Sequence, residues 1–159
     1  MSTDHWLTVA RETIAQVKFC WAITIAADGS PSARVIQPMP LADDWSVRFL
    51  TRRDGRKVAE IESAGRLTLG YQHDPEFAYV TLTGRPRVLD DVAYKRGIWS
   101  PVSERYYPGG PDDPNVAVVH LDTDRIELWS SLRKVAPEPY ALSAAILERD
   151  GAGWRTSQT

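Results

Sequence analysis

The sequence has little of what would adapt it to a membrane or to an oxidising compartment. Its 159 residues include one cysteine, Cys20, so no disulfide can form within the chain and a reducing compartment is expected. No run approaches the roughly 18 apolar residues that a membrane-spanning helix needs. Asp4, His5, Arg11 and Glu12 interrupt the beginning of the chain, where a signal peptide would have an apolar segment. We therefore predict a cytoplasmic protein with no membrane partner.

An excess of charge of one sign is also missing. Lys and Arg number 19 against 21 Asp and Glu, whereas proteins that bind nucleic acid normally have a basic excess. The three histidines lie far apart, and no CxxC, HxxxH or HExxH spacing occurs. P-loop, GxGxxG and GxSxG motifs are absent as well. We expect one domain over residues 1–159, with no nucleic-acid partner and no metal.

The hydrophobic pattern has a period of two through much of the chain, which is typical of strands. Strands are predicted at 19–26, 33–37, 45–51, 67–71, 77–88 and 116–129, the last broken near Asp122, and helices at 3–17, 54–63 and 90–99. Asp28-Gly29 predicts a hairpin turn, and Gly84 and Pro86 predict a bend. Together these elements predict a β-rich α+β fold, a six-stranded antiparallel barrel with short peripheral helices.

Two parts of this pattern carry further expectations. Strand 19–26 is apolar on both faces, which is typical of a strand covered on both sides. Cys20 lies in it with no neighbouring cation, so we expect a buried structural thiol and not a nucleophile. Beyond about residue 140 the pattern weakens, and a poorly structured tail is predicted.

A strand end followed by a basic segment is the clearest candidate site. Thr51 ends a predicted strand, and four cations follow as a helix begins: Arg52, Arg53, Arg56 and Lys57. Unpaired N–H groups at a helix start favour an anion, and arginine and lysine side chains suit phosphate oxygens. A solvated basic turn would have the same composition, so the residues alone leave both interpretations open.

Two other strand residues are candidates for contact with a ligand. Arg34 interrupts an apolar strand, so its charge must reach water, a carboxylate or a ligand. Trp129 shares one strand face with Arg125 and Glu127, opposite Ile126 and Leu128. We therefore expect Trp129 at a surface or cleft and not in the barrel interior.

Taken in order, these segments resemble the pyridoxamine 5′-phosphate oxidase-like flavin-binding split-barrel superfamily, and within it the general stress protein 26-like branch. The resemblance spans roughly residues 5–130 and is carried by Asp28–Pro31, Arg34–Ile36, Phe49–Thr51, Arg56–Lys57, Ile98–Pro101, Tyr107–Pro114, Thr83–Gly84 and Arg125–Trp129. It implies a six-stranded antiparallel split barrel that forms a homodimer and shares two FMN sites between its subunits.

The resemblance also implies roles for individual residues. Arg34, Val35, Ile36 and Gln37 correspond to the strand along the isoalloxazine ring, with a basic contact. Leu50 and Thr51 correspond to the strand end near the ribityl phosphate, and Arg56 and Lys57 to the basic pair that holds that phosphate. Trp129 corresponds to the tryptophan that reaches the flavin from the other subunit.

The chain departs from the vitamin B6 oxidases of this superfamily at three places. Tyr79 stands where those enzymes have a glutamine that reaches the flavin, and Ser130–Val135 replaces their Arg-x-His substrate segment. Their Ser-Gln element for FMN is not evident either. We therefore expect flavin binding without typical pyridoxamine phosphate oxidase activity.

Three functions stay open at this stage. The first is an FMN-dependent oxidoreductase acting on an unidentified small molecule, with the redox chemistry supplied by the flavin. The second is a reductase that uses the deazaflavin F420, whose acidic tail would need a longer basic groove such as Arg52, Arg53 and Arg56 could provide. The third is a non-catalytic flavin-binding or stress-related protein. Haem is not favoured, because none of the three histidines has a recognisable axial position.

Overall fold

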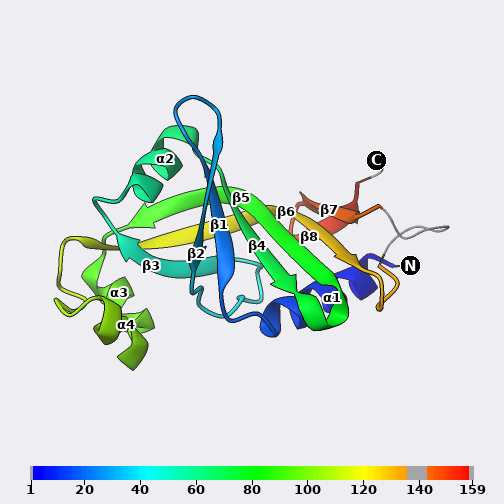
Figure 1. The fold of residues 1–159 in the computed structure, drawn as a ribbon, viewed down its shortest axis with the longest axis horizontal. Coiled ribbons are helices and arrows are strands. Elements are labelled where there is room, and N and C mark those ends of the chain that lie inside the picture. The colour runs from blue at the N-terminus through cyan, green and yellow to red at the C-terminus, as the bar shows by residue number, and fades with distance from the viewer. Residues whose placement is uncertain (1, 136–142, 158–159) are drawn as a thin grey trace.

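One antiparallel sheet organises the computed structural model, which describes residues 2–135 and 143–157. Its strands within these residues are β1 Cys20–Ile25, β2 Pro31–Ile36, β3 Val47–Arg52, β4 Leu67–His73, β5 Ala78–Leu89, β6 Val116–Ser130, β7 Ala145–Asp150 and β8 Gly153–Thr156. They run in the order β2-β1-β4-β5-β6-β7-β8, and β3 pairs with β6. Because β6 pairs with β3 through its first half and with β7 through its second, the sheet curls around a common core (Figure 1).

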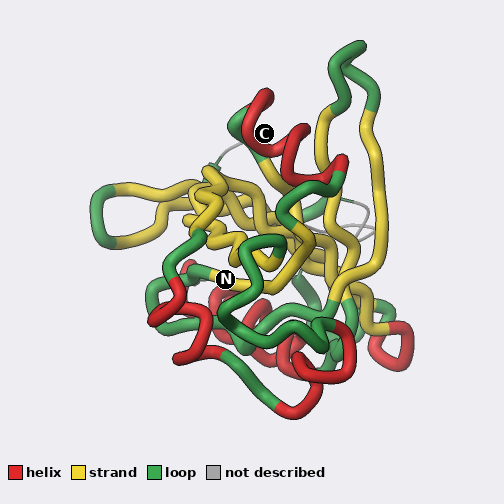
Figure 2. The backbone as a smooth tube through the Cα atoms, turned by 90° about the vertical axis from the view of Figure 1, so that its left-hand side faces the viewer, coloured by secondary structure: helices red, strands yellow, loops and turns green. Residues whose placement is uncertain are grey.

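Short helices lie around this sheet. They are α1 Thr3–Ala15, α2 Arg56–Ala64, α3 Val92–Ile98 and α4 Pro101–Tyr106, with a 3-10 turn, η1, at Asp74–Glu76. The α2 helix lies beside the β1–β2 hairpin, which projects beyond the rest of the molecule, whereas α3 and α4 lie together at one end (Figures 1 and 2). None of the helices in the described ranges is long and apolar enough to cross a bilayer.

The core confirms several sequence predictions. Alternate strand residues such as Leu69, Leu82 and Leu128 are fully buried inside the curled sheet, and Cys20 is buried with them. Burial raises the pKa of the Cys20 thiol to about 12, so it stays protonated at neutral pH. The predicted bend is a shift in register between Thr83 and Gly84. A Cβ at Gly84 would lie 1.9 Å from the Asp122 carbonyl oxygen, so this position requires glycine.

Two predictions about the elements were wrong. The sheet has eight strands in the described residues and not six, because the tail predicted to be poorly structured forms the β7–β8 hairpin; residues 140–142 of that tail lie outside the described ranges. Ala145 and Leu147 are buried in the core, so neighbouring strands stabilise a segment that has only these two buried positions of its own. The α4 helix was also not predicted, since its six residues follow Pro101 in a segment that resembles a loop.

The outer face of β1 is more open than the sequence predicts. Cys20, Ala22 and Thr24 point inward and are buried, but Trp21 on the other face is 47% exposed. Val35, which pairs with Trp21 across the β1–β2 ladder, is exposed as well, and so is Phe19. In the single chain, therefore, an apolar area on this side of the sheet has no cover.

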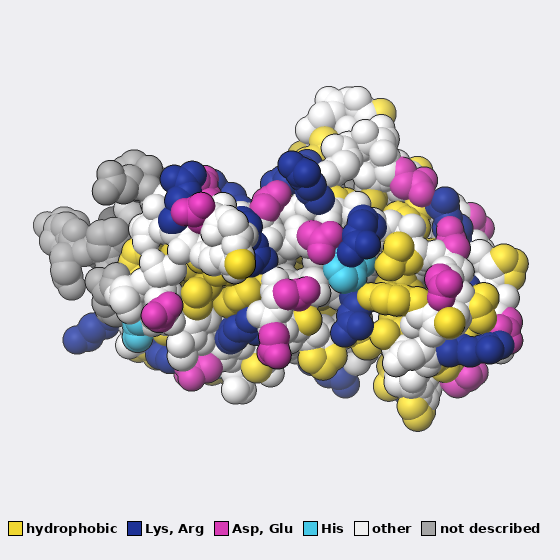
Figure 3. Space-filling view, turned by 180° about the vertical axis from the view of Figure 1, so that it is seen from behind, with side chains coloured by type: hydrophobic (Ala, Val, Ile, Leu, Met, Phe, Trp, Pro, Cys, Tyr) yellow, Lys and Arg dark blue, Asp and Glu magenta, His cyan; other side chains and the backbone are white. Residues whose placement is uncertain are grey.

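The opposite side of the molecule has a different character. Lys and Arg side chains lie next to Asp and Glu side chains across this surface, so neither sign forms a continuous field there (Figure 3). Exposed ion pairs of the described chain include Arg66 with Asp124 at 2.7 Å and Arg87 with Asp122 at 3.0 Å. Exposed pairs of this kind contribute little to stability.

Candidate functional site

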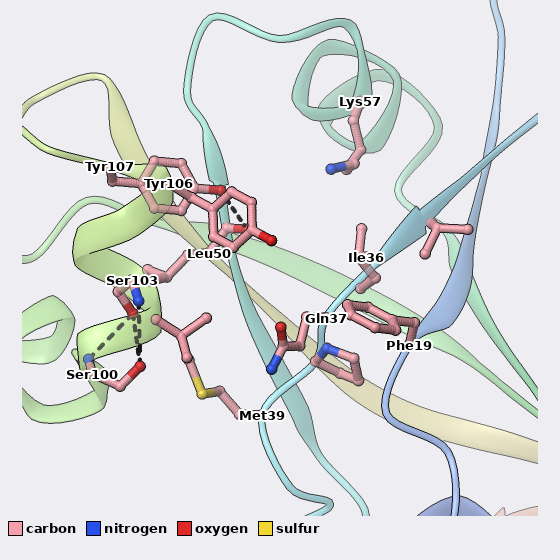
Figure 4. Close-up of a pocket in the computed structure, with 13 residues that line it drawn as sticks. Phe19, Ile36, Gln37, Met39, Leu50, Lys57, Ser100, Ser103, Tyr106 and Tyr107 are labelled. Atoms are coloured by element: carbon pink, nitrogen blue, oxygen red, sulfur yellow. Dashed lines mark hydrogen bonds between the residues drawn. The ribbon is translucent and has the colours of Figure 1, made fainter.

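A cleft of about 340 Å³ lies where the end of β2, the strand β3 and the helix α4 come together (Figure 4). Ile36, Gln37 and Met39 line one side of this cleft, and Leu50 lines its floor. The other side is formed by α4 and the residue that follows it. Among the residues that the structure describes, the cleft is lined by Phe19, Val35, Ile36, Gln37, Pro38, Met39, Leu50, Lys57, Ser100, Val102, Ser103, Tyr106 and Tyr107.

Lys57 supplies the charge of the cleft. It lies in the first turn of α2 and extends toward the cleft, where its Nζ donates a hydrogen bond to Thr51 Oγ1 at 3.0 Å (Figure 4). The Phe49 ring lies below it, 5.5 Å from Nζ to the ring centroid. In the described part of the chain no carboxylate lies within ion-pair distance of this ammonium group. Burial, together with the positive charge of Arg34, lowers the pKa of Lys57 from its usual value.

The other three cations of the basic segment are paired with carboxylates. Arg52 binds Asp54 at 3.0 Å, and Arg53 binds both Glu62 at 2.9 Å and Asp90 at 3.4 Å. Arg56 is 76% exposed and binds Glu60, four residues further along α2, at 3.3 Å. Lys57 is therefore the one cation of the segment that faces the cleft.

Arg34 reaches a carboxylate, one of the three destinations that its sequence context allows. Its Nη2 lies 3.3 Å from Glu60 Oε2, and its Nη1 donates to Thr24 Oγ1 at 2.5 Å and to the Ser32 carbonyl at 3.0 Å. The Thr24 hydroxyl also donates to Glu60, and this hydrogen bond, followed by the contact with Arg34, lowers the pKa of Glu60. Arg34 does not line the cleft, and its implied contact with a flavin stays a prediction.

A second hollow, here called the cup, lies at the turn between β4 and β5. Its described lining is Gln72, Asp74, Phe77, Ala78, Tyr79 and Trp129, and its volume is about 410 Å³. Tyr79 and Trp129 are register partners on β5 and β6, and their rings stack with centroids 6.4 Å apart and planes inclined by 23°. The Tyr79 hydroxyl donates to Glu127 Oε1 at 3.0 Å. Burial, with a smaller contribution from this carboxylate, raises the pKa of Tyr79 to about 12.

The structure thus divides the predicted site residues among three places. Val35, Ile36, Gln37, Leu50 and Lys57 line the cleft, where Thr51 holds the lysine. Arg34 and Arg56 meet at Glu60, beside the cleft and not in it. Tyr79 and Trp129 line the cup. Trp129 is only partly buried while Ile126 and Leu128 are fully buried, which confirms the predicted assignment of strand faces.

Sequence reasoning missed several lining residues. On the cleft side they include Ser100, Ser103 and Tyr107. The Tyr107 hydroxyl donates to the Leu50 carbonyl at 3.2 Å. Ser100 and Ser103 form a capping box at the start of α4, with Pro101 at the first helical position, so the Ser-Pro-x-Ser pattern was an available helix signal. On the cup side, Asp74 and Phe77 belong to a turn, and no pattern in the sequence marks them as a site.

The fold and the cleft agree with one protein family. The family model described as "Pyridoxamine 5′-phosphate oxidase like" matches residues 7–150, and the chain belongs to this family. General stress protein 26 of Bacillus subtilis is 29% identical over 95 residues, which cover 58% of this chain and 67% of that protein.

Solved structures show the same fold. A protein related to general stress protein 26 from Clostridium acetobutylicum superposes with a TM-score of 0.77 at 21% identity, covering 96% of this chain and 100% of that one. A pyridoxamine 5′-phosphate oxidase-related, FMN-binding protein from Nostoc punctiforme superposes with a TM-score of 0.71 at 14% identity, covering 99% and 96%. These likenesses confirm the predicted split-barrel class of fold.

Proposed function

We propose that this chain is an FMN-binding flavoprotein that acts as an oxidoreductase on a small molecule. The observation that carries the proposal is Lys57, a partly buried cation at the start of α2 with no carboxylate partner among the described residues. A buried charge without a partner is costly, so its position favours an anionic ligand. Family membership and the FMN-binding description of the Nostoc punctiforme relative support the same ligand.

The residues of the cleft fit the parts of FMN. Lys57 and the Thr51 hydroxyl would hold the phosphate, helped by the start of α2, where Gly55 leaves the first backbone N–H groups without a side-chain cap. Ile36 and Leu50 offer apolar surface for the flat ring system, and Gln37 offers an amide beside it. Bound FMN would supply the redox chemistry, while the chain positions it and shields it from water.

We further propose that two chains share each FMN. Most of the residues that the resemblance gathers around one flavin lie in the cleft or in the cup, which are separate hollows of one chain. In a two-fold dimer, if the cleft of one subunit contacts the cup of its partner, the cup of the first contacts the cleft of the partner as well. One interface would therefore form two identical sites. The exposed Phe19, Trp21 and Val35 are apolar surface that such an interface would cover. A cytoplasmic location of this dimer stays a prediction.

The F420 alternative receives less support. It depended on Arg52, Arg53 and Arg56 as a free basic groove, and each of them is paired with a carboxylate of its own chain. The third possibility, a flavin-binding or stress-related protein without turnover, shares the same cleft. If NADH or NADPH reduces bound FMN faster than free FMN, the oxidoreductase hypothesis is favoured over the non-catalytic one.

The test compares FMN with riboflavin, which lacks the phosphate. Lys57→Ala should weaken FMN binding by about 1.5–3 kcal/mol, the contribution of hydrogen bonds to a charged group, and leave riboflavin binding nearly unchanged. Binding is followed by flavin fluorescence. Arg53→Ala is the matched control, because it removes a paired cation of the same segment and should leave both affinities close to wild type. An equal loss for both flavins in Lys57→Ala would show that the lysine is structural.

A further inference from the structure

The cup has a chemistry of its own that the cofactor proposal uses only through Tyr79 and Trp129. Three aromatic side chains line it, Phe77, Tyr79 and Trp129, and the stacked pair of Tyr79 and Trp129 forms one wall. Asp74 is the one formally charged side chain among its described lining residues. The cup therefore combines flat apolar surfaces with a negative charge, whereas the cleft has a positive one.

Phe77 is placed in the cup by an unusual backbone conformation. Its φ is +46°, in the left-handed region that bulky side chains rarely adopt, and it ends the short turn η1. The side chain is nevertheless 64% exposed, so it does not compensate for this conformation by packing into the core. An exposed aromatic ring held at a strained position is typical of a binding surface.

The polar groups around the cup keep its charge negative. Gln72 Nε2 donates to Asp74 Oδ1 at 2.6 Å, which orients the carboxylate without neutralising it. Tyr79 stays protonated and donates to Glu127, so a second carboxylate lies behind the aromatic wall. Arg125, on the same strand face, pairs with Glu127 at 3.9 Å, so the negative charge of the cup rests on Asp74. No lysine or arginine lines the cup in the described ranges.

We propose that the cup forms the substrate side of the shared site and selects flat aromatic or heteroaromatic compounds that are cationic or neutral over anionic ones. This rests on the proposed function, because only a shared site brings the cup of one subunit to the flavin of the other. Aromatic rings stack on flat ligands and attract cations over their faces, and the Asp74 carboxylate adds attraction for a positive charge and repulsion of a negative one. The absence of the Arg-x-His substrate segment at Ser130–Val135 agrees with a substrate that is not a phosphate anion.

The test uses three probes that share one ring system and differ in charge: N-methylquinolinium, quinoline and quinoline-2-carboxylate. Calorimetric titration of the FMN-loaded protein should show the cation binding at least about tenfold more tightly than the anion, with quinoline between them. Asp74→Asn should reduce this cation-to-anion ratio to about threefold or less. Phe77→Ala should weaken all three probes while leaving their ratio close to that of the wild type.

Glu76→Gln is the matched control, because Glu76 belongs to the same turn as Asp74 but does not line the cup. It should change the ratio by less than about twofold. An anion that binds as tightly as the cation, or a ratio that Asp74→Asn leaves unchanged, would overturn the selectivity. A titration with FMN on the same preparation separates the two proposals: if FMN does not bind, the proposed function fails, while an Asp74-dependent preference in the flavin-free protein still supports the cup as an aromatic-cation site.

Discussion

The cleft and the cup differ in the charge and in the side chains that line them, and their residues are brought together in different ways. The cleft has a cation, Lys57, seven positions along the chain from Leu50, so one strand end and one helix start assemble its polar end. The cup joins residues of β4, β5 and β6, and Tyr79 meets Trp129 only through the register of the sheet. Lys57 and Asp74 are thus both placed by local structure, whereas the long-range pairing of β5 with β6 brings Trp129 to the cup.

Removal of a phenylalanine should affect the two regions very differently. Phe49, under Lys57, is fully buried, and Phe49→Ala should lower the free energy of unfolding by about 3–5 kcal/mol, as expected for a large cavity in the core. Phe77 in the cup is mostly exposed, so Phe77→Ala should change stability by less than about 1 kcal/mol. Urea unfolding measures both variants. Comparable losses would mean that the cup is part of the core.

The pH dependence of FMN binding should reflect the titration of Lys57 in the cleft and not of any group in the cup. Lys57 is protonated below its lowered pKa, so the preference for FMN over riboflavin is present there and declines as the pH rises through that value. The decline should therefore begin below 10.5, the usual value for lysine, and approach the full loss of about 1.5–3 kcal/mol expected for Lys57→Ala. The ratio of the two affinities is the measurement, because both flavins share the same ring. A ratio constant up to pH 10.5 would exclude Lys57 as the phosphate contact.

Loss of the indole should weaken the cofactor site without unfolding the protein. Trp129→Ala removes the ring that stacks on Tyr79, and we expect FMN affinity to fall by about 1 kcal/mol, roughly fivefold. The loss of stability should be smaller than the ~3–5 kcal/mol of a core tryptophan. Flavin affinity and the urea midpoint are measured on one preparation. Unchanged affinity with a collapse in stability would show that Trp129 is a core residue and not a flavin contact.

Sedimentation tests whether FMN promotes dimers. Tight FMN binding by a stable monomer would show that the two subunits do not share the flavin.

The smallest effect is expected at Arg56, although the resemblance pairs it with Lys57. Its guanidinium is mostly exposed and is bound to Glu60, and exposed ion pairs contribute about 1 kcal/mol or less. Arg56→Ala should therefore weaken FMN binding by no more than about this amount, measured by flavin fluorescence beside Lys57→Ala. A loss equal to that of Lys57→Ala would show that Arg56 leaves Glu60 to bind the phosphate.

Much of the fold could be predicted from local patterns. The alternation of apolar residues identified the strands of the sheet through β6, and Asp28-Gly29 and Gly84 marked a turn and a bend that the structure confirms. The β7–β8 hairpin was missed because β7 has only two buried positions and β8 has none, which is too few to show a period. Their order depends on Ala145 and Leu147 packing into a core built by other strands.

The candidate site divides along the same line. By itself the sequence determined the cation at a helix start and the strand face of Trp129, because both follow from periodicities over a few residues. Only the tertiary structure decided that Arg34 binds Glu60, 26 positions away, and that Trp129 of β6 stands beside the turn with Asp74 and Phe77. Long-range contacts depend on which strands pair and in what register, and that choice is made by burial of the whole core and not by any short segment.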